Sequence, residues 1–408
     1  MTGDSKSNII WYSSQMTESR ERAVSYVRTP YLVVHREAAP RKDVYGSIDD
    51  NVVLQAQLLR GPEPSKTAIV AMHPIGAPGY LPMFSGLARA GYHVIACATR
   101  YSTGDGGLQM ENVLLDLGAC VRDARERLGY ERILLAGWSG GGSVMLGYQA
   151  EAEQPRISLT AAGDYTPLSE TRLPAADGVL VLAAHRSRHH LITEFLDPSI
   201  TDENDPWSRV AAWNLYDPAG GHVAPFPADF VVEYRERQRS RNRRISEFAK
   251  AELDRLRKDG REHAERCFVV HGTMADPRWL DLTIDPNDRV LGSYLGEPSI
   301  ANDSAAGLAR FTTTRSWLSQ WSLDDAQVVG VEGASRLSVP TLIIVNSADD
   351  ACPTPHCRAI FDAIPHEDKE FHEVTGANHY YSGPGQRAHL AEAITTMTTW
   401  ADGHGFRS

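Results

Sequence analysis

The sequence has few cysteines and no long apolar run. Its 408 residues include five cysteines, and none of its apolar stretches approaches the roughly 20 residues that a membrane-spanning helix needs. The N-terminal "MTGDSKSNIIWYSSQ" lacks the basic start and apolar core of a signal peptide. An odd, dispersed set of cysteines is typical of free thiols in a reducing compartment. We therefore expect a cytoplasmic protein with no membrane partner.

Basic residues are fewer than acidic residues. Lysine and arginine number 41 against 52 aspartates and glutamates, which gives a net charge of −11. A protein that binds nucleic acid needs a basic surface, so we expect no nucleic-acid partner. The most basic stretch (231–260) could bind phosphate or carboxylate groups, but it interleaves its arginines with acids, and we favour a solvated helix face. Its apolar positions are expected to pack inward: Phe248, Ala251, Leu253 and Leu256.

Glycine motifs that cradle phosphate are also missing. The segment "RILLAGWSGGGS" (132–143) has no lysine after its glycines, as a P-loop would require. It also fails the dinucleotide pattern G-x-G-x-x-G, because Ser139 stands at the second glycine. The stretch "STGDGGLQ" (102–109) fails at Gln109. We expect no cofactor.

What the sequence does contain is an alternation of short apolar runs and helical patterns. Strands are expected at 31–37, 51–61, 67–72, 93–100, 132–137, 178–184, 340–347 and 369–374, and helices at 83–92, 111–130, 355–363 and 386–400. Near-continuous apolar runs are typical of strands buried on both faces. The order strand, helix, strand predicts an α/β protein with a doubly wound, mostly parallel sheet.

The alternation fails between two of the expected strands. We predict an N-terminal arm (1–30), a core built from 31–184 and 338–408, and a large, mainly helical cap insertion (185–337). The cap carries aromatic and basic residues that could suit an apolar or aromatic acyl group with an anion. The aromatic residues are Trp213, Tyr216, Trp279, Tyr294, Trp317 and Trp321.

One motif carries chemistry. Gly137, Ser139 and Gly141 form G-x-S-x-G between a buried strand and a helical pattern. A serine at such a turn adopts a strained backbone conformation that exposes its hydroxyl, and the residues two before and two after must be small. The following helix N-terminus adds free N–H groups.

At this point the chain resembles the α/β-hydrolase superfamily, whose order is nucleophile, acid and histidine, each after a strand. The resemblance implies Ser139 as nucleophile and His379, in "VTGANHYYSG" (374–383), as base. The acid is expected in "LIIVNSADDACP" (342–353), four residues before Pro353. That spacing favours Asp349 and leaves Asp350 as the alternative.

An oxyanion hole needs two backbone N–H donors. The resemblance implies Gly140 and a residue of "HPIGAPG" (73–79). Pro74 has no N–H, so the second donor is Ile75 or Gly76, and position favours Ile75. Trp138, beside the nucleophile, either lines the acyl pocket or packs under the cap.

These residues predict a serine hydrolase that cleaves a small-molecule carboxylic ester or lactone through an acyl-enzyme. A C–C bond hydrolase of diketones and a thioesterase are the alternatives on the same scaffold, and a non-catalytic ligand-binding protein is a further one. Cys352, His356 and Cys357 cluster in "CPTPHC" but lack a fourth ligand, so no metal is expected. A homodimer is left open.

Overall fold

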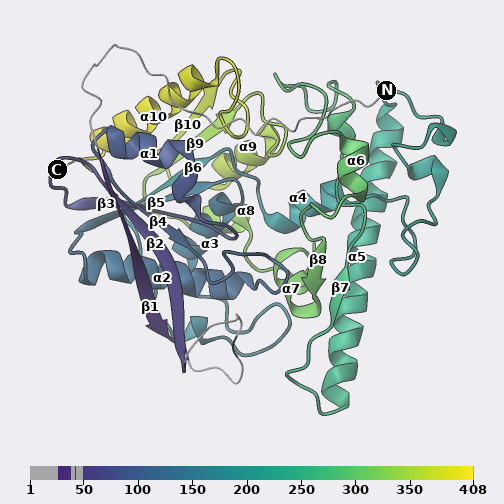
Figure 1. Cartoon of the computed structure of the whole chain (residues 1–408), viewed down its shortest axis with the longest axis horizontal. Helices are drawn as coiled ribbons and strands as arrows, with labels where there is room; N and C mark the ends of the chain where they lie inside the picture. The colour runs from purple at the N-terminus through teal and green to yellow at the C-terminus, as the bar shows by residue number, and fades with distance from the viewer. Residues whose placement is uncertain (1–25, 38–41, 43–48, 408) are drawn as a thin grey trace, which may run out of the picture.

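The computed structural model describes residues 26–37, 42 and 49–407. Its main feature is an eight-stranded sheet (Figure 1). The strands are β1 (Val27–Arg36), β2 (Asn51–Arg60), β3 (Thr67–His73), β4 (His93–Ala98), β5 (Arg132–Trp138), β6 (Gly178–Leu182), β9 (Thr341–Asn346) and β10 (Lys369–Val374). The predicted N-terminal arm lies mostly outside the described residues, and its last four positions belong to β1.

The sheet has the spatial order β1-β2-β4-β3-β5-β6-β9-β10. β2 pairs antiparallel with both of its neighbours, whereas every pairing from β4 to β10 is parallel. Strands β4, β6 and β9 are buried along their whole length, which explains their continuous apolar sequences. The predicted doubly wound, mostly parallel sheet is confirmed.

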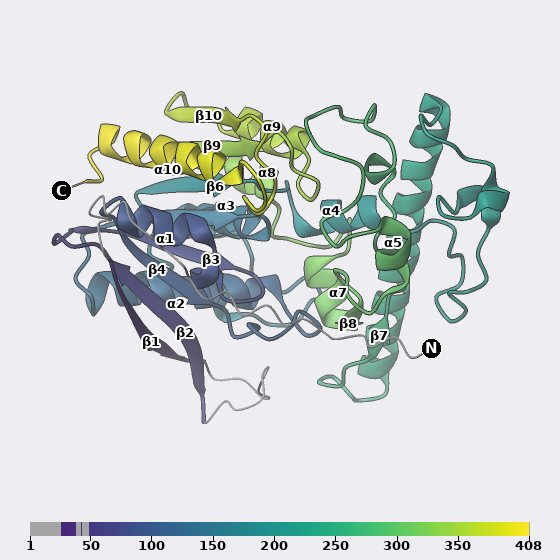
Figure 2. The ribbon, with the colours of Figure 1, turned by 45° about the horizontal axis from the view of Figure 1, so that its top comes forward.

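Helices cover both faces of the sheet (Figure 2). One face packs against α2 (Met110–Glu126), α3 (Gly140–Glu153), α8 (Gly330–Ala334) and α9 (Thr354–Ala363). The other face packs against α1 (Pro82–Arg89) and α10 (Gln386–Gly403). Each face therefore has its own apolar layer, and the loops at the strand ends stay free to carry side chains of the site.

The chain leaves the sheet after β6 and returns to it at β9, the neighbouring strand. The long segment between them contains α4 (Arg188–Phe195), α5 (Ala228–Lys258), β7 (Cys267–Val269), α6 (Pro298–Asp303), β8 (Phe311–Thr313) and α7 (Thr314–Gln320). It has an apolar core of its own, which includes Phe195, Trp279 and Trp317. We call residues 185–337 the cap. The boundaries of the cap stay a prediction. Near its C-terminal end, Ala334 and Leu337 pack with the sheet.

The long cap helix α5 buries a different stripe from the one expected. Leu253 and Leu256 are buried, but Phe248 is 40% exposed and Ala251 is exposed. The buried stripe instead begins with Tyr234 and continues through Gln238, Arg241, Asn242, Ile245, Ala249 and Leu253. The expectation for Phe248 and Ala251 was wrong because this helix buries polar side chains whose hydrogen-bond partners lie elsewhere in the cap.

The five cysteines are all unpaired: Cys97, Cys120, Cys267, Cys352 and Cys357. Among the described helices, none combines the length and apolar character needed to cross a lipid bilayer.

Candidate active site

The turn between β5 and α3 holds Ser139 in an unusual backbone conformation. Its φ is 54° and its ψ is −124°, a region that costs a non-glycine residue about 1–3 kcal/mol. Its N–H donates to Leu182 O at 3.0 Å, which ties the turn to β6. A Cβ on Gly137 would stand 2.4 Å from Gly141 O, and one on Gly141 would stand 2.5 Å from Met72 O. Both flanking glycines are therefore sterically required.

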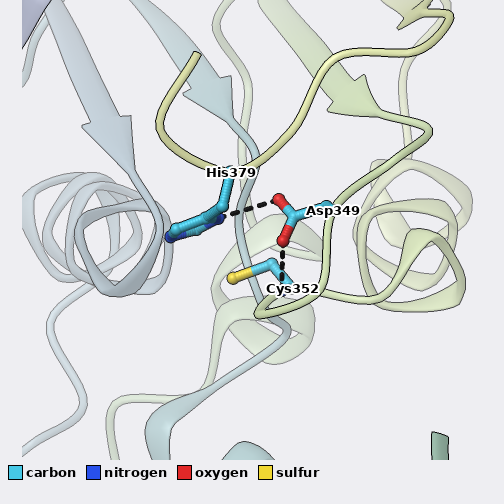
Figure 3. A group of neighbouring side chains, drawn as sticks. All are labelled: Asp349, Cys352 and His379. Carbon is cyan, nitrogen blue, oxygen red and sulfur yellow. Dashed lines mark hydrogen bonds and ion pairs between the residues drawn. The ribbon is translucent and has the colours of Figure 1, made fainter. Parts of the chain in front are cut away.

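Two further loops bring an acid and a histidine together at the same edge of the sheet. Asp349 follows β9 and His379 follows β10, and both are 2% exposed. His379 Nδ1 lies 2.8 Å from Asp349 Oδ2 (Figure 3). The other carboxylate oxygen accepts the N–H groups of Ala351 at 2.8 Å and Cys352 at 2.7 Å. Because Nδ1–H donates to the carboxylate, Nε2 is left as the basic nitrogen.

The arrangement combines a mostly parallel sheet with β2 reversed, a strained serine after β5, and acid and histidine loops after the last two strands. The chain has the α/β-hydrolase fold. Ligands in open α/β sheets bind at the carboxyl ends of the strands, and all three predicted triad residues lie there.

Several solved structures resemble the chain at low sequence identity. The monoacylglycerol lipase of Paleococcus ferrophilus is 16% identical with a TM-score of 0.42, over 84% of this chain and 98% of that one. Est1E from Butyrivibrio proteoclasticus is 13% identical with a TM-score of 0.43, over 86% and 96%. The α/β-hydrolase GrgF from Penicillium sp. sh18 is 12% identical with a TM-score of 0.46, over 91% and 96%.

No family model matches the sequence, and no curated protein matches it. The strand order and the conformation of Ser139 therefore carry the assignment of the α/β-hydrolase fold.

The Ser139 side chain contacts a cysteine that sequence reasoning did not place in the site. Ser139 Oγ lies 3.7 Å from Cys352 Sγ. Burial raises the pKa of the Cys352 thiol well above its ordinary value, and the Asp349 carboxylate raises it further. A thiol that stays protonated is a poor nucleophile, which leaves the hydroxyl as the candidate.

Ser139 and His379 line one cavity of about 230 Å³. The loop after β3 forms part of its wall through His73, Ile75 and Gly76. His73 Nδ1 lies 2.7 Å from Ile75 O and 3.3 Å from Ile75 N. When Nδ1 carries a proton and donates to Ile75 O, it cannot also accept a hydrogen bond from the Ile75 N–H. That N–H can then donate to another acceptor. The roles of Ile75 and Gly140 as oxyanion donors stay predictions.

Trp138 packs against the histidine loop. Its ring centroid lies 4.5 Å from that of His379 and 5.2 Å from that of Tyr380. Its Nε1–H donates to His379 O at 3.1 Å. Trp138 also lines the cavity. Trp138 therefore holds the loop that carries His379, and a contact with substrate stays a prediction.

Besides Leu308, sequence reasoning missed three cap side chains that line the cavity: His185, Arg188 and Leu191. All three follow β6, whose carboxyl end lies at the same edge of the sheet as the serine turn. Their position directly after a predicted strand was the feature of the sequence that could have identified them as cavity residues. Of the six cap aromatics expected near the acyl group, Tyr294 lines the cavity. Trp279, Trp317 and Trp321 instead form the cap's own core, because the cap must bury apolar surface to fold.

Burial keeps two histidines of the cavity neutral, His73 and His185. It lowers the pKa of His73 to about 4 and the pKa of His185 well below its ordinary value, and the nearby Arg188 lowers both further. Among the described residues that line the cavity, Arg188 is thus the positively charged side chain.

Three potential metal ligands lie close together: Asp349, Cys352 and His379 have ligand atoms within 4.8 Å of one another. Asp349 and His379 already bond to each other, and the thiol would have to ionise against its raised pKa. The cysteines and histidine of "CPTPHC", which the sequence already disfavours as a metal site, have other partners: Cys357 donates to Ala184 O and His356 pairs with Glu194. Both sets suit hydrogen bonding better than metal ligation.

Proposed function

We propose that the protein is a serine hydrolase that cleaves a small carboxylic ester or lactone. The observation that carries the proposal is the Asp349–His379 hydrogen bond of 2.8 Å in the cavity that Ser139 lines. A serine hydroxyl needs a base, and the base needs an acid that fixes its tautomer.

In the proposed reaction, the Ser139 hydroxyl turns from Cys352 toward His379 Nε2 and attacks the substrate carbonyl as the ring accepts its proton. Contacts between nucleophile and base are often loose before substrate binds. Asp349 stabilises the imidazolium, and the N–H groups of Gly140 and Ile75 hold the oxyanion. The ring then protonates the leaving alcohol, and water attacks the acyl-enzyme by the same route.

Steady-state hydrolysis of p-nitrophenyl esters tests this proposal. Ser139→Ala should lower kcat by about 10⁴-fold or more, as loss of a triad nucleophile does. The control is Ser335→Ala, which removes an exposed serine at the end of α8 and should keep full activity.

Unchanged turnover by Ser139→Ala would refute the proposal. A wild-type chain that cleaves only a thioester or a diketone in a parallel panel would move the function to the corresponding alternative on the same scaffold.

A further inference from the structure

One charged side chain in the catalytic cavity has no role in the reaction described above. Arg188 is the first residue of α4 and is 3% exposed. It lines the same cavity as Ser139 and His379. Its Nη1 lies 3.5 Å from the point where a Cβ on Gly140 would stand, so the guanidinium reaches the residue next to the nucleophile.

The guanidinium is anchored through one nitrogen. Nη2 donates to Gln320 Oε1 at 2.7 Å and to Asp105 Oδ2 at 3.3 Å. The planar group also lies over the ring of Trp321, with Cζ 4.1 Å from the ring centroid. These contacts fix the orientation of the side chain, which is the condition for precise recognition of a ligand.

The rest of the guanidinium is unsatisfied. Nε is buried without a hydrogen-bond partner, and Nη1 has no acceptor among the described residues. Arginine carries five N–H donors, and a buried donor without an acceptor is destabilising. An unsatisfied cation in a catalytic cavity indicates a ligand that supplies the missing acceptor.

The charges around Arg188 suit an anionic ligand. Burial lowers the pKa of Arg188 to about 10, with Asp105 opposing that shift, so the group is cationic at neutral pH. His73 and His185 lie beside it and are neutral there, because burial lowers the pKa of each ring. Asp105 contacts Nη2, the nitrogen that also donates to Gln320, so Asp105 makes no hydrogen bond with Nη1.

The remaining cavity surface is largely apolar. Leu191 and Leu308 of the cap face it, as do Leu81 and Tyr380 of the core. With a volume of about 230 Å³, the cavity is below the size usual for drug-sized ligands. A short acyl chain fits this space better than a long lipid chain.

We propose that Arg188 determines substrate specificity by binding a carboxylate carried on a short acyl chain, a few bonds from the scissile carbonyl. This inference rests on the proposed function. Planar guanidinium groups are well suited to carboxylates. The preferred substrates are therefore monoesters of short dicarboxylic acids.

Two esters of equal chain length test the proposal: mono-p-nitrophenyl glutarate, which has a free carboxylate, and p-nitrophenyl valerate, which is neutral. Arg188→Met should lower kcat/KM for the glutarate ester by about 10- to 100-fold, the usual effect of losing a hydrogen bond to a charged group. Hydrolysis of the valerate ester should fall much less, so that the ratio of the two kcat/KM values decreases. Arg188→Lys should retain part of the preference.

The matched control is Arg186→Met. Arg186 precedes Arg188 by two residues and pairs with Glu194 at 3.5 Å. This variant should keep the ratio of the two kcat/KM values. Equal losses on both esters in Arg188→Met, or no loss on either, would overturn the proposal, because a structural or oxyanion role affects both substrates alike.

A binding measurement separates this inference from the proposed function. The Ser139→Ala chain should bind monomethyl glutarate more tightly than methyl valerate in a calorimetric titration. Adding Arg188→Met should remove that difference. Equal binding of the two ligands by Ser139→Ala would refute the Arg188 assignment even if the chain hydrolyses esters, and a difference would support it even if the chain hydrolyses none.

Discussion

At the scale of single residues, two adjacent aspartates have opposite environments. Asp349 accepts three hydrogen bonds, from His379 and from two backbone N–H groups. Asp350 is partly buried, and burial together with the Asp349 carboxylate raises its pKa to about 6. Its backbone carbonyl accepts the indole N–H of Trp279 at 2.7 Å. A difference of one position along the chain therefore separates the candidate acid from an aspartate whose backbone carbonyl contacts the cap.

This contrast makes a prediction about catalysis. Asp349→Asn should lower kcat by about 10³- to 10⁴-fold, because an amide stabilises the wrong tautomer of His379 and no longer offsets its positive charge. Asp350→Asn should leave kcat nearly unchanged. Ester hydrolysis by the two variants, with matched thermal unfolding as the check on folding, measures the difference. A larger loss in Asp350→Asn would assign the acid to Asp350 instead.

Much of the candidate site could be predicted from the sequence, since Ser139 and Asp349 each follow a buried strand and His379 follows β10, the last strand of the alternation, of which only Val374 is buried. The other side chains could not. Cys352 meets Ser139 only because the loop after β9 folds back, and Arg188 enters the cavity only because of the direction in which α4 leaves β6. Both positions depend on tertiary packing, which leaves no local pattern.

At the scale of elements, α5 illustrates how a polar helix can be a buried one. Arg241 lies in its buried stripe and is 1% exposed. It donates to Glu203 at 2.9 and 2.7 Å and to the carbonyl oxygens of Asp197, His271 and Gly272. The charged pattern led to a prediction of a solvated face. That prediction fails at Arg241 because periodicity in apolar residues cannot report a buried arginine.

Two arginines of α5 should differ in their contribution to stability. Arg241→Met should lower the free energy of unfolding by about 1–3 kcal/mol, because it leaves buried carbonyl groups without their donor, while Glu203 keeps Arg244 as a partner. Arg243→Met breaks an exposed pair with Asp324 at 2.7 Å and should cost less than about 1 kcal/mol.

Urea unfolding followed by tryptophan fluorescence compares these two variants with the wild-type chain. Similar midpoints for both variants would mean that the buried network around Arg241 does not hold the cap together.

At the scale of the whole molecule, the sheet core and the cap meet at the cavity. The core supplies Ser139 and His379, and the cap supplies Arg188 and Tyr294. The sheet could be predicted from the sequence because its central strands are buried along their whole length and are almost continuously apolar. The interior of the cap could not, because β7 and β8 have three residues each and form only by pairing across a long stretch of chain.

The central claim is that Ser139 is an activated nucleophile. Mass spectrometry of the chain after treatment with a fluorophosphonate tests it most directly. The account predicts one adduct, on the peptide that carries Ser139, absent in Ser139→Ala and slowed in Asp349→Asn. An unmodified wild-type chain, or an adduct that persists in Ser139→Ala, would contradict it.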